Sequence, residues 1–243
     1  MKLYIIRHAQ SFNNALADQR DRVCDPDLTE LGYQQAEIVA RHLADGFDPE
    51  YRLGESDEDT TLRRRHSYNI THLYCSAMYR ALLTAKPIGQ ALGLSPELWV
   101  DIHEHGGIFL DHGPEQGVMG YPGRTRSEIL AEFPHYILPD EITAAGWWKP
   151  EWGKEDWPTC YGRAIRVAHH LRKRAVSDDH IAMVSHGGFI DVLIKALTQQ
   201  LPNRQLFYHH YNTAITRVDF REDGTMDIRQ INRYDHLPPE MFS

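Results

Sequence analysis

Residues 3–14, LYIIRHAQSFNN, decide how the rest of the chain is interpreted. The apolar run that opens this stretch is typical of a short buried strand. The strand ends at Arg7 and His8, and a polar turn follows. Open α/β sheets bind ligands at the carboxyl ends of their strands, which is where this pair is expected. An arginine matches a phosphate in charge and geometry, and a histidine can attack phosphorus or transfer protons. Alone, the pair is equally typical of a solvated strand end.

The composition is that of an ordinary globular protein. The chain has 243 residues, of which 42% are hydrophobic and 25% charged, and this length can bury one sizeable core. A formal net charge of −8 argues against a nucleic-acid or anionic membrane surface, although one local basic pocket could still bind a small anion. Neither a signal peptide nor an apolar run of ~18 residues is visible, so no membrane span is expected.

The cysteines and histidines indicate neither a disulfide framework nor a metal site. The three cysteines are widely spaced and form no CxxC pair, which makes a reducing cytoplasm the simplest location. Fifteen histidines are many, but they form no HExxH pattern. We therefore expect no metal and no cofactor.

Strands and helices are expected to alternate along most of the chain. Apolar periods and capping residues predict helices over 27–46, 76–93, 127–133, 159–175 and 189–197. Further strands are expected at 69–75, 97–101 and 180–185, followed by an antiparallel pair at 212–220 and 225–233. This alternation predicts an α/β fold, a three-layer α/β/α sandwich with a mainly parallel central sheet and antiparallel C-terminal edge strands. Residues 1–243 are expected to form one domain.

Two stretches interrupt this alternation. Residues 47–68 are polar and charged, and they predict an exposed insertion that is partly disordered. Residues 110–158 contain four tryptophans, Trp147, Trp148, Trp152 and Trp157, among several prolines and glycines. This second stretch could form a cap over the sheet edge, or its aromatic residues could serve only as packing. Arg124 and Arg126 within it are candidates for substrate contact.

Each predicted strand-to-helix junction presents polar candidates. Arg7 and His8 follow the first strand, and Arg80, Glu104 and His186 follow the others. Because the carboxyl ends of parallel strands lie along one edge of a sheet, these side chains are expected to meet. Arginines and histidines can surround a phosphoryl group, and one histidine can carry it. An acid can protonate the departing oxygen and then activate water. Positive charge supplied by the protein would make magnesium unnecessary.

The sequence resembles the histidine phosphatase superfamily, in its phosphoglycerate-mutase-like branch. RHAQSFNN resembles the signature RHG(E/Q)SxxN, SAMYRALLTA resembles SxxxRAxxTA, VSHGGFI matches the second histidine motif, and HEHGG fits the place of the acid. The resemblance implies that His8 is the phosphorylated nucleophile and Glu104 the general acid and base. It also implies the residues that hold the phosphate, namely Arg7, Asn14, Arg80 and His186. By motif position, Ser11 and Gly187 lie beside the pocket.

Three departures from the family pattern bear on the activity. Ala9 replaces a glycine, and a methyl group there is tolerable unless φ must be positive. Where the mutases resemble one another in Glu-Arg-His-Tyr-Gly, Glu104 is followed by His-Gly-Gly. Residues 23–27, VCDPD, stand where the mutases carry Phe-Thr-Gly-Trp. The last two departures favour a phosphatase over a mutase.

The resemblance thus predicts a metal-independent phosphomonoester hydrolase, histidine acid phosphatase-like, that acts on a small phosphorylated substrate. A 2,3-bisphosphoglycerate-dependent phosphoglycerate mutase and a non-catalytic phospho-ligand binder are the alternatives. The substrate itself is not indicated. The C-terminal edge strand could pair into a homodimer, or residues 237–242 could cover it.

Overall fold

A computed structural model describes residues 1–49 and 65–243 of the chain. Within these residues, a central sheet has the strand order β10-β9-β1-β8-β4-β5. Strand β1 is parallel to β8, which is parallel to β4, and β4 is parallel to β5, whereas β9 and β10 run antiparallel. The strands are β1 (Lys2–Arg7), β4 (His72–Cys75), β5 (Glu97–Leu98), β8 (His180–Ser185), β9 (Ile215–Phe220) and β10 (Met226–Arg233). The predicted mainly parallel sheet with antiparallel C-terminal edge strands is confirmed.

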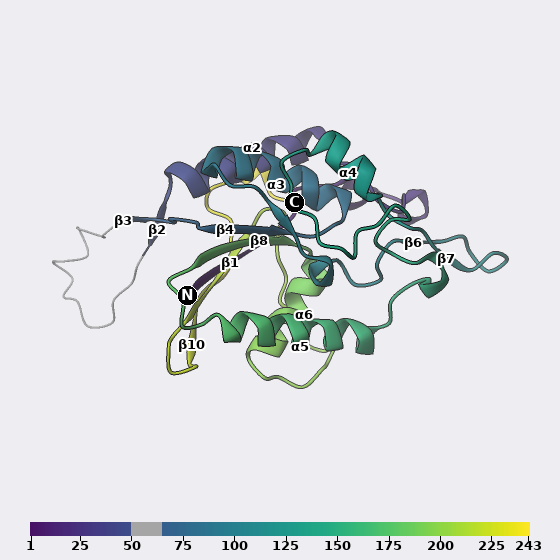
Figure 1. Ribbon diagram of the computed structural model, residues 1–243. Coiled ribbons are helices and arrows are strands. Elements are labelled where there is room, and N and C mark those ends of the chain that lie inside the picture. Colours follow the sequence, from purple (N-terminus) through teal and green to yellow (C-terminus); the bar gives the residue numbers. More distant parts are fainter. Residues whose placement is uncertain (50–64) are drawn as a thin grey trace.

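Helices cover both faces of this sheet (Figure 1). Helices α2 (Glu30–Asp45) and α3 (Tyr79–Leu92) pack together on one face, and α5 (Trp157–Lys173) and α6 (Gly187–Leu197) pack together on the other. Successive side chains of a strand point to opposite faces. The two hydrophobic cores therefore share β1, because Tyr4 and Ile6 belong to one core and Leu3 and Ile5 to the other. The predicted three-layer architecture is confirmed.

Some helices and strands begin or end at other residues than the sequence predicts. Helix α2 is capped by Thr29, whose hydroxyl accepts a hydrogen bond from the backbone N–H of Gly32 at 3.0 Å. Helix α3 begins at Tyr79 rather than at Ser76, and it continues through Pro87. The predicted strand 97–101 is shorter, because a 3-10 turn follows Leu98 after one residue.

Part of the predicted exposed insertion is buried. Strands β2 (Phe47–Pro49) and β3 (Arg65–Ser67) pair with each other, and Tyr68 beside them is fully buried. The ring of Tyr68 packs against Tyr4 with 5.2 Å between centroids, and its hydroxyl lies 2.6 Å from His42 Nε2. The prediction of exposure is wrong at this end of the stretch, because an aromatic ring in a polar sequence fills the core. Residues 50–64 lie outside the described residues.

The stretch 110–158 contains more regular structure than its sequence pattern indicates. Strands β6 (Phe109–Asp111) and β7 (Val118–Gly120) form a separate hairpin, and α4 (Arg126–Glu132) follows. Figure 1 shows the hairpin beside the main sheet, with α4 above it. The remaining short elements are α1 (Phe12–Ala15) and the 3-10 turns η1 (Gln19–Asp21), η3 (Val100–Ile102), η4 (Pro150–Trp152) and η5 (Pro239–Met241). Among the described residues, no helix is both long and apolar enough to span a membrane.

Candidate active site

The register of the parallel strands brings the predicted site residues to one edge of the sheet. Arg7 at the end of β1 lies opposite Ser185 at the end of β8, and Cys75 at the end of β4 lies opposite Val184. The backbone N–H of His8 donates to the carbonyl of Ser185 at 2.8 Å. The chain segments that follow β1, β4 and β8 therefore start side by side.

His8 is buried and held in one tautomer. Its Nδ1 lies 2.6 Å from the carbonyl oxygen of Ala9, which can only accept, so Nδ1 carries the proton. Nε2 then carries the lone pair, which accepts a hydrogen bond from Arg80 Nε at 3.1 Å. Burial, followed by the charges of Arg80 and Arg7, lowers the pKa of His8 well below its ordinary value of 6.5. His8 is consequently a neutral imidazole with Nε2 directed into the cluster.

His186 faces His8 across this cluster. The two ring centroids lie 5.0 Å apart, and His186 Nε2 lies 2.8 Å from the hydroxyl of Ser76. The other ring nitrogen, Nδ1, is buried without a hydrogen-bond partner in the described part of the chain. Burial, and then the neighbouring Arg80, lower the pKa of His186 well below 6.5. A buried polar atom without a partner is costly, so this atom is a candidate to contact a bound ligand.

Two guanidinium groups supply positive charge to the site. Arg7 Nη1 donates to the carbonyl of His210 at 2.6 Å, while its Nε is buried and has no partner among the described residues. Burial lowers the pKa of both Arg7 and Arg80, but a guanidinium remains protonated in proteins. A methyl group at Gly187 would lie 3.5 Å from Arg7 Nε, which places the Gly187 backbone against this guanidinium.

The carboxylate of Glu104 lies at the N-terminus of α6. It accepts hydrogen bonds from the backbone N–H groups of Gly188 at 3.2 Å, Phe189 at 3.0 Å and its own neighbour His105 at 2.8 Å. A helix N-terminus favours a negative charge. A Cβ atom at Gly188 would lie 2.6 Å from Glu104 Oε1, so only glycine permits this approach. The second glycine after His186 therefore leaves room for the Glu104 carboxylate and donates a hydrogen bond to it.

Asn14 and Ser11 lie on the turn after His8. The backbone N–H and the hydroxyl of Ser11 both donate to Asn14 Oδ1, at 3.1 and 3.0 Å. These bonds occupy the carbonyl end of the Asn14 side chain, so that its NH2 group remains available as a donor. Ser11 is buried and shapes the turn, whereas Asn14 is exposed.

Sequence reasoning did not assign roles to three residues at the site. Asn212 is buried, and its Nδ2 donates to the carbonyl of His8 at 2.7 Å. Asp25 accepts from the backbone N–H of Tyr79 at 2.9 Å, and its Oδ2 is buried with no partner in the described residues. Burial raises the pKa of Asp25 to about 6, opposed by the charge of Arg80. The only sequence signal for Asp25 is its place in residues 23–27, which differ from the mutase pattern. The third residue, Ser76, positions His186 through the 2.8 Å contact of its hydroxyl.

Arg124 lines a cavity of about 440 Å3 together with Asp25 and Tyr79, whereas Arg126 does not. The Arg124 guanidinium covers the ring of Tyr79 at 3.5 Å and pairs with Glu132 at 2.9 Å. Arg126 instead donates to backbone carbonyls at 138, 139 and 142. Of the two arginines proposed for substrate contact, only Arg124 lines this cavity.

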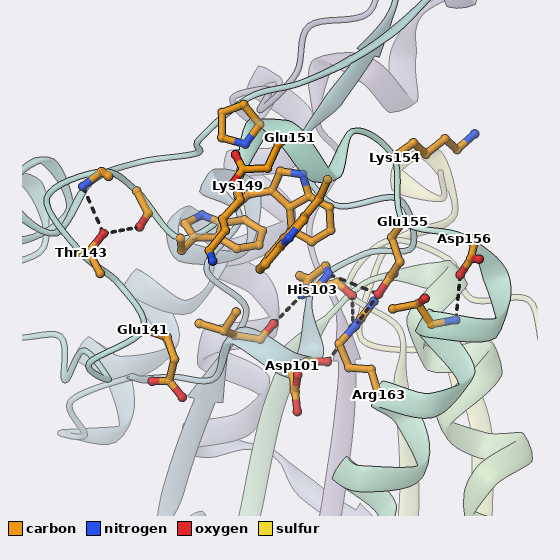
Figure 2. A pocket seen from close by; sticks show the side chains of 18 of the residues that line it. Asp101, His103, Glu141, Thr143, Lys149, Glu151, Lys154, Glu155, Asp156 and Arg163 are labelled. Carbon is orange, nitrogen blue, oxygen red and sulfur yellow. Dashed lines mark hydrogen bonds and ion pairs between the residues drawn. The ribbon is translucent and has the colours of Figure 1, made fainter.

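Three of the four tryptophans, Trp147, Trp148 and Trp152, line a second cavity of about 970 Å3, shown in Figure 2. Trp147 and Trp148 are buried, while Trp152 is 53% exposed. His103, which precedes Glu104, also lines this cavity. The first two tryptophans therefore pack behind the loop that carries the acid. Within residues 1–49 and 65–243, no group of three or more His, Cys, Asp or Glu side chains is arranged to hold a metal ion.

Comparisons with known proteins show the family and the fold of the chain. The sequence model of the histidine phosphatase superfamily (branch 1) matches residues 3–233. A search of curated protein sequences found no match. A solved mycobacterial glucosyl-3-phosphoglycerate phosphatase in complex with VO3 is similar in structure, with a TM-score of 0.57 and 20% identity, over 96% of this chain and 99% of that one.

A phosphoserine phosphatase from Entamoeba histolytica is similar in two solved complexes. Its complex with 3-phosphoglyceric acid has a TM-score of 0.56 and 22% identity, over 98% of this chain and 99% of that one. A mutant in complex with phosphoserine has a TM-score of 0.54 and 23% identity, with the same coverage. At these identities the structural likeness establishes the fold alone.

Proposed function

Because the chain belongs to the histidine phosphatase superfamily (branch 1), we propose that it hydrolyses phosphomonoesters through a phosphohistidine formed on His8. The observation that carries this proposal is the state of the His8 side chain. Its Nδ1 proton is engaged by the Ala9 carbonyl, and its Nε2 lone pair faces the guanidinium of Arg80 at 3.1 Å. A phosphoryl group bound by Arg80 would therefore meet a neutral nitrogen nucleophile.

Binding of the phosphoryl group rests on donors that have no other partner. Arg7 Nε and His186 Nδ1 are buried and unpartnered among the described residues. The Ser76 hydroxyl accepts from the backbone N–H of Met78 at 3.3 Å and can donate its own proton to His186 Nε2. That orientation puts the imidazole proton on His186 Nδ1, ready for a phosphoryl oxygen. These donors, together with the two guanidinium groups, stabilise the charge that develops during transfer.

In the first step, His8 Nε2 forms a bond to phosphorus while the bond from phosphorus to the ester oxygen breaks. Glu104, protonated at that moment, donates its proton to the departing oxygen and releases an alcohol. In the second step, the Glu104 carboxylate takes a proton from water, whose oxygen attacks the phosphohistidine. Inorganic phosphate leaves, and His8 returns to its neutral state.

A small phosphorylated metabolite is the proposed substrate class. The structurally similar proteins are described as phosphatases of glucosyl-3-phosphoglycerate and of phosphoserine. The cavity of about 440 Å3 offers Arg124, Tyr79 and Asp25 to the rest of such a substrate. These groups can bind carboxylate, hydroxyl or ammonium substituents through charge and hydrogen bonds.

Phosphate release from a broad panel of phosphomonoesters, with EDTA present, tests the proposal. Wild-type turnover should survive EDTA, since Arg7 and Arg80 supply the positive charge. His8→Ala should abolish turnover, and Glu104→Gln should lower kcat by roughly 10²-fold or more. Undiminished turnover by His8→Ala, or no release of phosphate from any ester by the wild type, would contradict the proposal.

A further inference from the structure

A buried ion pair lies directly behind the loop that carries Glu104. Arg163 on α5 donates to Glu155 through Nε at 3.0 Å and through Nη2 at 2.6 Å, and the two side chains are only 3% and 2% exposed. Figure 2 shows Arg163 reaching from the helix toward Asp101 and His103, with Glu155 beside it. A two-pronged pair of this kind is rigid, because the guanidinium fork matches the carboxylate.

Both members of the pair hold the backbone on either side of Glu104. Arg163 Nη1 donates to the carbonyl of Asp101 at 2.5 Å and to that of His103 at 2.8 Å. On the other side, the backbone N–H of Glu155 donates to the carbonyl of Gly106 at 3.1 Å. The loop from 101 to 106 is therefore bonded to the Arg163 side chain before the acid and to the Glu155 backbone after it.

The same arginine contacts the helix end that receives the carboxylate. The guanidinium of Arg163 lies over the ring of Phe189 at 4.6 Å from its centroid. Phe189 is fully buried, and its backbone N–H donates to Glu104 Oε1 at 3.0 Å. One side chain thus fixes the loop that presents the acid and packs on the residue that binds it.

We propose that Arg163 and Glu155 are positioning residues that hold Glu104 in line for proton transfer to the leaving group; this inference rests on the acid role proposed for Glu104. Replacing a buried ion pair with apolar residues of similar volume is often neutral for stability. The fold should therefore tolerate loss of the pair, whereas the acid should lose its fixed position. A misplaced catalytic group lowers the rate without removing the phosphate site.

Esters with different leaving groups distinguish a misplaced Glu104 from a general loss of activity. An alkyl phosphate needs its departing oxygen protonated, whereas p-nitrophenyl phosphate releases a stabilised phenolate that needs little help. In the double variant Glu155→Met with Arg163→Met, kcat/KM for an alkyl phosphate should fall roughly tenfold or more, and kcat/KM for the nitrophenyl ester less than about threefold. The comparison uses kcat/KM because it reports the steps through departure of the alcohol, whereas kcat also includes hydrolysis of the phosphohistidine, in which Glu104 acts as the base for both esters. Inhibition by inorganic phosphate should stay near the wild-type value, since phosphate contacts are unchanged.

A matched control variant lies on the same helix. Arg166 pairs with the Asp101 side chain at 3.1 Å, but it is 63% exposed and is not bonded to the loop backbone. Arg166→Met should leave both rates unchanged. Glu104→Gln supplies the reference and should show the same selective loss for the alkyl ester. Should the double variant fail to fold by circular dichroism, Glu155→Gln, which keeps one acceptor for Arg163, should show a smaller loss with the same selectivity.

Three outcomes distinguish the positioning role of the ion pair from the acid role of Glu104. Selective loss in both Glu104→Gln and the ion-pair variant supports the inference. Selective loss in Glu104→Gln, combined with equal losses or no loss for the two esters in the ion-pair variant, overturns the positioning role alone. Equal losses in Glu104→Gln itself would refute the acid role in the proposed function, and the positioning role with it.

Discussion

At the scale of single residues, burial changes the charge states of the candidate site. His8 and His186 are kept neutral because burial and neighbouring arginines lower the pKa of each. The pKa of Asp25 shifts in the opposite direction, since burial raises it from 3.8 to about 6. The positive charge of the candidate site thus comes from Arg7 and Arg80, while both histidines are uncharged.

The raised pKa of Asp25 predicts a pH-dependent cost to stability. The folded state binds the Asp25 proton more tightly than the unfolded state does, so stability present below about pH 4 is lost as the pH rises through about 6. Asp25→Asn removes the ionisation and keeps an acceptor for Tyr79. Relative to wild type, its free energy of unfolding should therefore rise by up to ~3 kcal/mol between pH 4 and pH 8. Urea denaturation at the two pH values measures this, and an unchanged difference would contradict it.

The residue identities of the cluster could be predicted, but their protonation could not. Sequence motifs placed Arg7, His8, Arg80, Glu104 and His186 at strand ends, and the structure brings those ends together. Tautomers depend on contacts that no motif shows, such as the 2.6 Å contact from His8 Nδ1 to the Ala9 carbonyl.

At the scale of elements, the N-terminus of α6 binds the Glu104 carboxylate through its backbone N–H groups. Its first residues are glycines, and the second of them leaves room for the Glu104 carboxylate. A parallel sheet brings the loop after β5 and the start of α6 to the same edge, which is why an acid from one can bind the other.

Gly188→Ala should displace the acid without changing the phosphate donors. The added methyl group would lie 2.6 Å from Glu104 Oε1, so the carboxylate must move. We expect kcat for alkyl phosphates to fall roughly 10- to 100-fold, with KM for phosphate esters little changed. Steady-state kinetics checks this, with Gly162→Ala on α5 as a control, because nothing lies within 4 Å of its added methyl group. Equal activity in both variants would show that Glu104 needs no such space.

Element boundaries were less predictable than element types. The sequence period identified α5 and β8 closely, because each has a regular apolar pattern. Strand β5 and the β6–β7 hairpin are only two or three residues long per strand, which is too short for any period to show. Tyr68 was placed with the polar insertion because a single buried ring carries no pattern.

At the scale of the whole molecule, the turn after β1 is held by segments far apart in the sequence. Gln35 on α2 is fully buried; its Oε1 accepts from the backbone N–H of Gln10 at 2.8 Å, and its Nε2 donates to the Met241 carbonyl at 2.8 Å. Asn212 connects the His8 carbonyl to Ser243 through bonds of 2.7 and 2.9 Å. The turn after β1 is therefore attached to both α2 and the C-terminal segment.

Gln35→Ala should loosen this arrangement. It removes buried hydrogen bonds and leaves the N–H of Gln10 without a partner, at a cost of about 1–3 kcal/mol in the free energy of unfolding. Because the same bonds hold the turn next to His8, we also expect kcat to fall several-fold. Chemical denaturation and kinetics test both effects, with the exposed neighbour Gln34→Ala as a control. A Gln35→Ala variant with wild-type stability and wild-type kcat would show that the turn after β1 keeps its position without Gln35.

These long-range contacts could not be predicted from one sequence. Gln35 lies in an amphipathic helix where a buried glutamine breaks the apolar pattern, and only the tertiary structure shows what it bonds. The sheet edge was predictable because topology alone brings parallel strand ends together. The proposed single domain and the homodimer stay predictions.

The most direct test of the proposed mechanism is to trap the phosphoryl enzyme. The Glu104→Gln variant, which should hydrolyse the intermediate slowly, is mixed with a p-nitrophenyl phosphate substrate and quenched in base, where phosphohistidine survives. Peptide mass spectrometry should find one phosphoryl group on His8, and none in a variant that also carries His8→Asn. A phosphoryl group on another residue, or none while phosphate is still released, would contradict a phosphohistidine on His8.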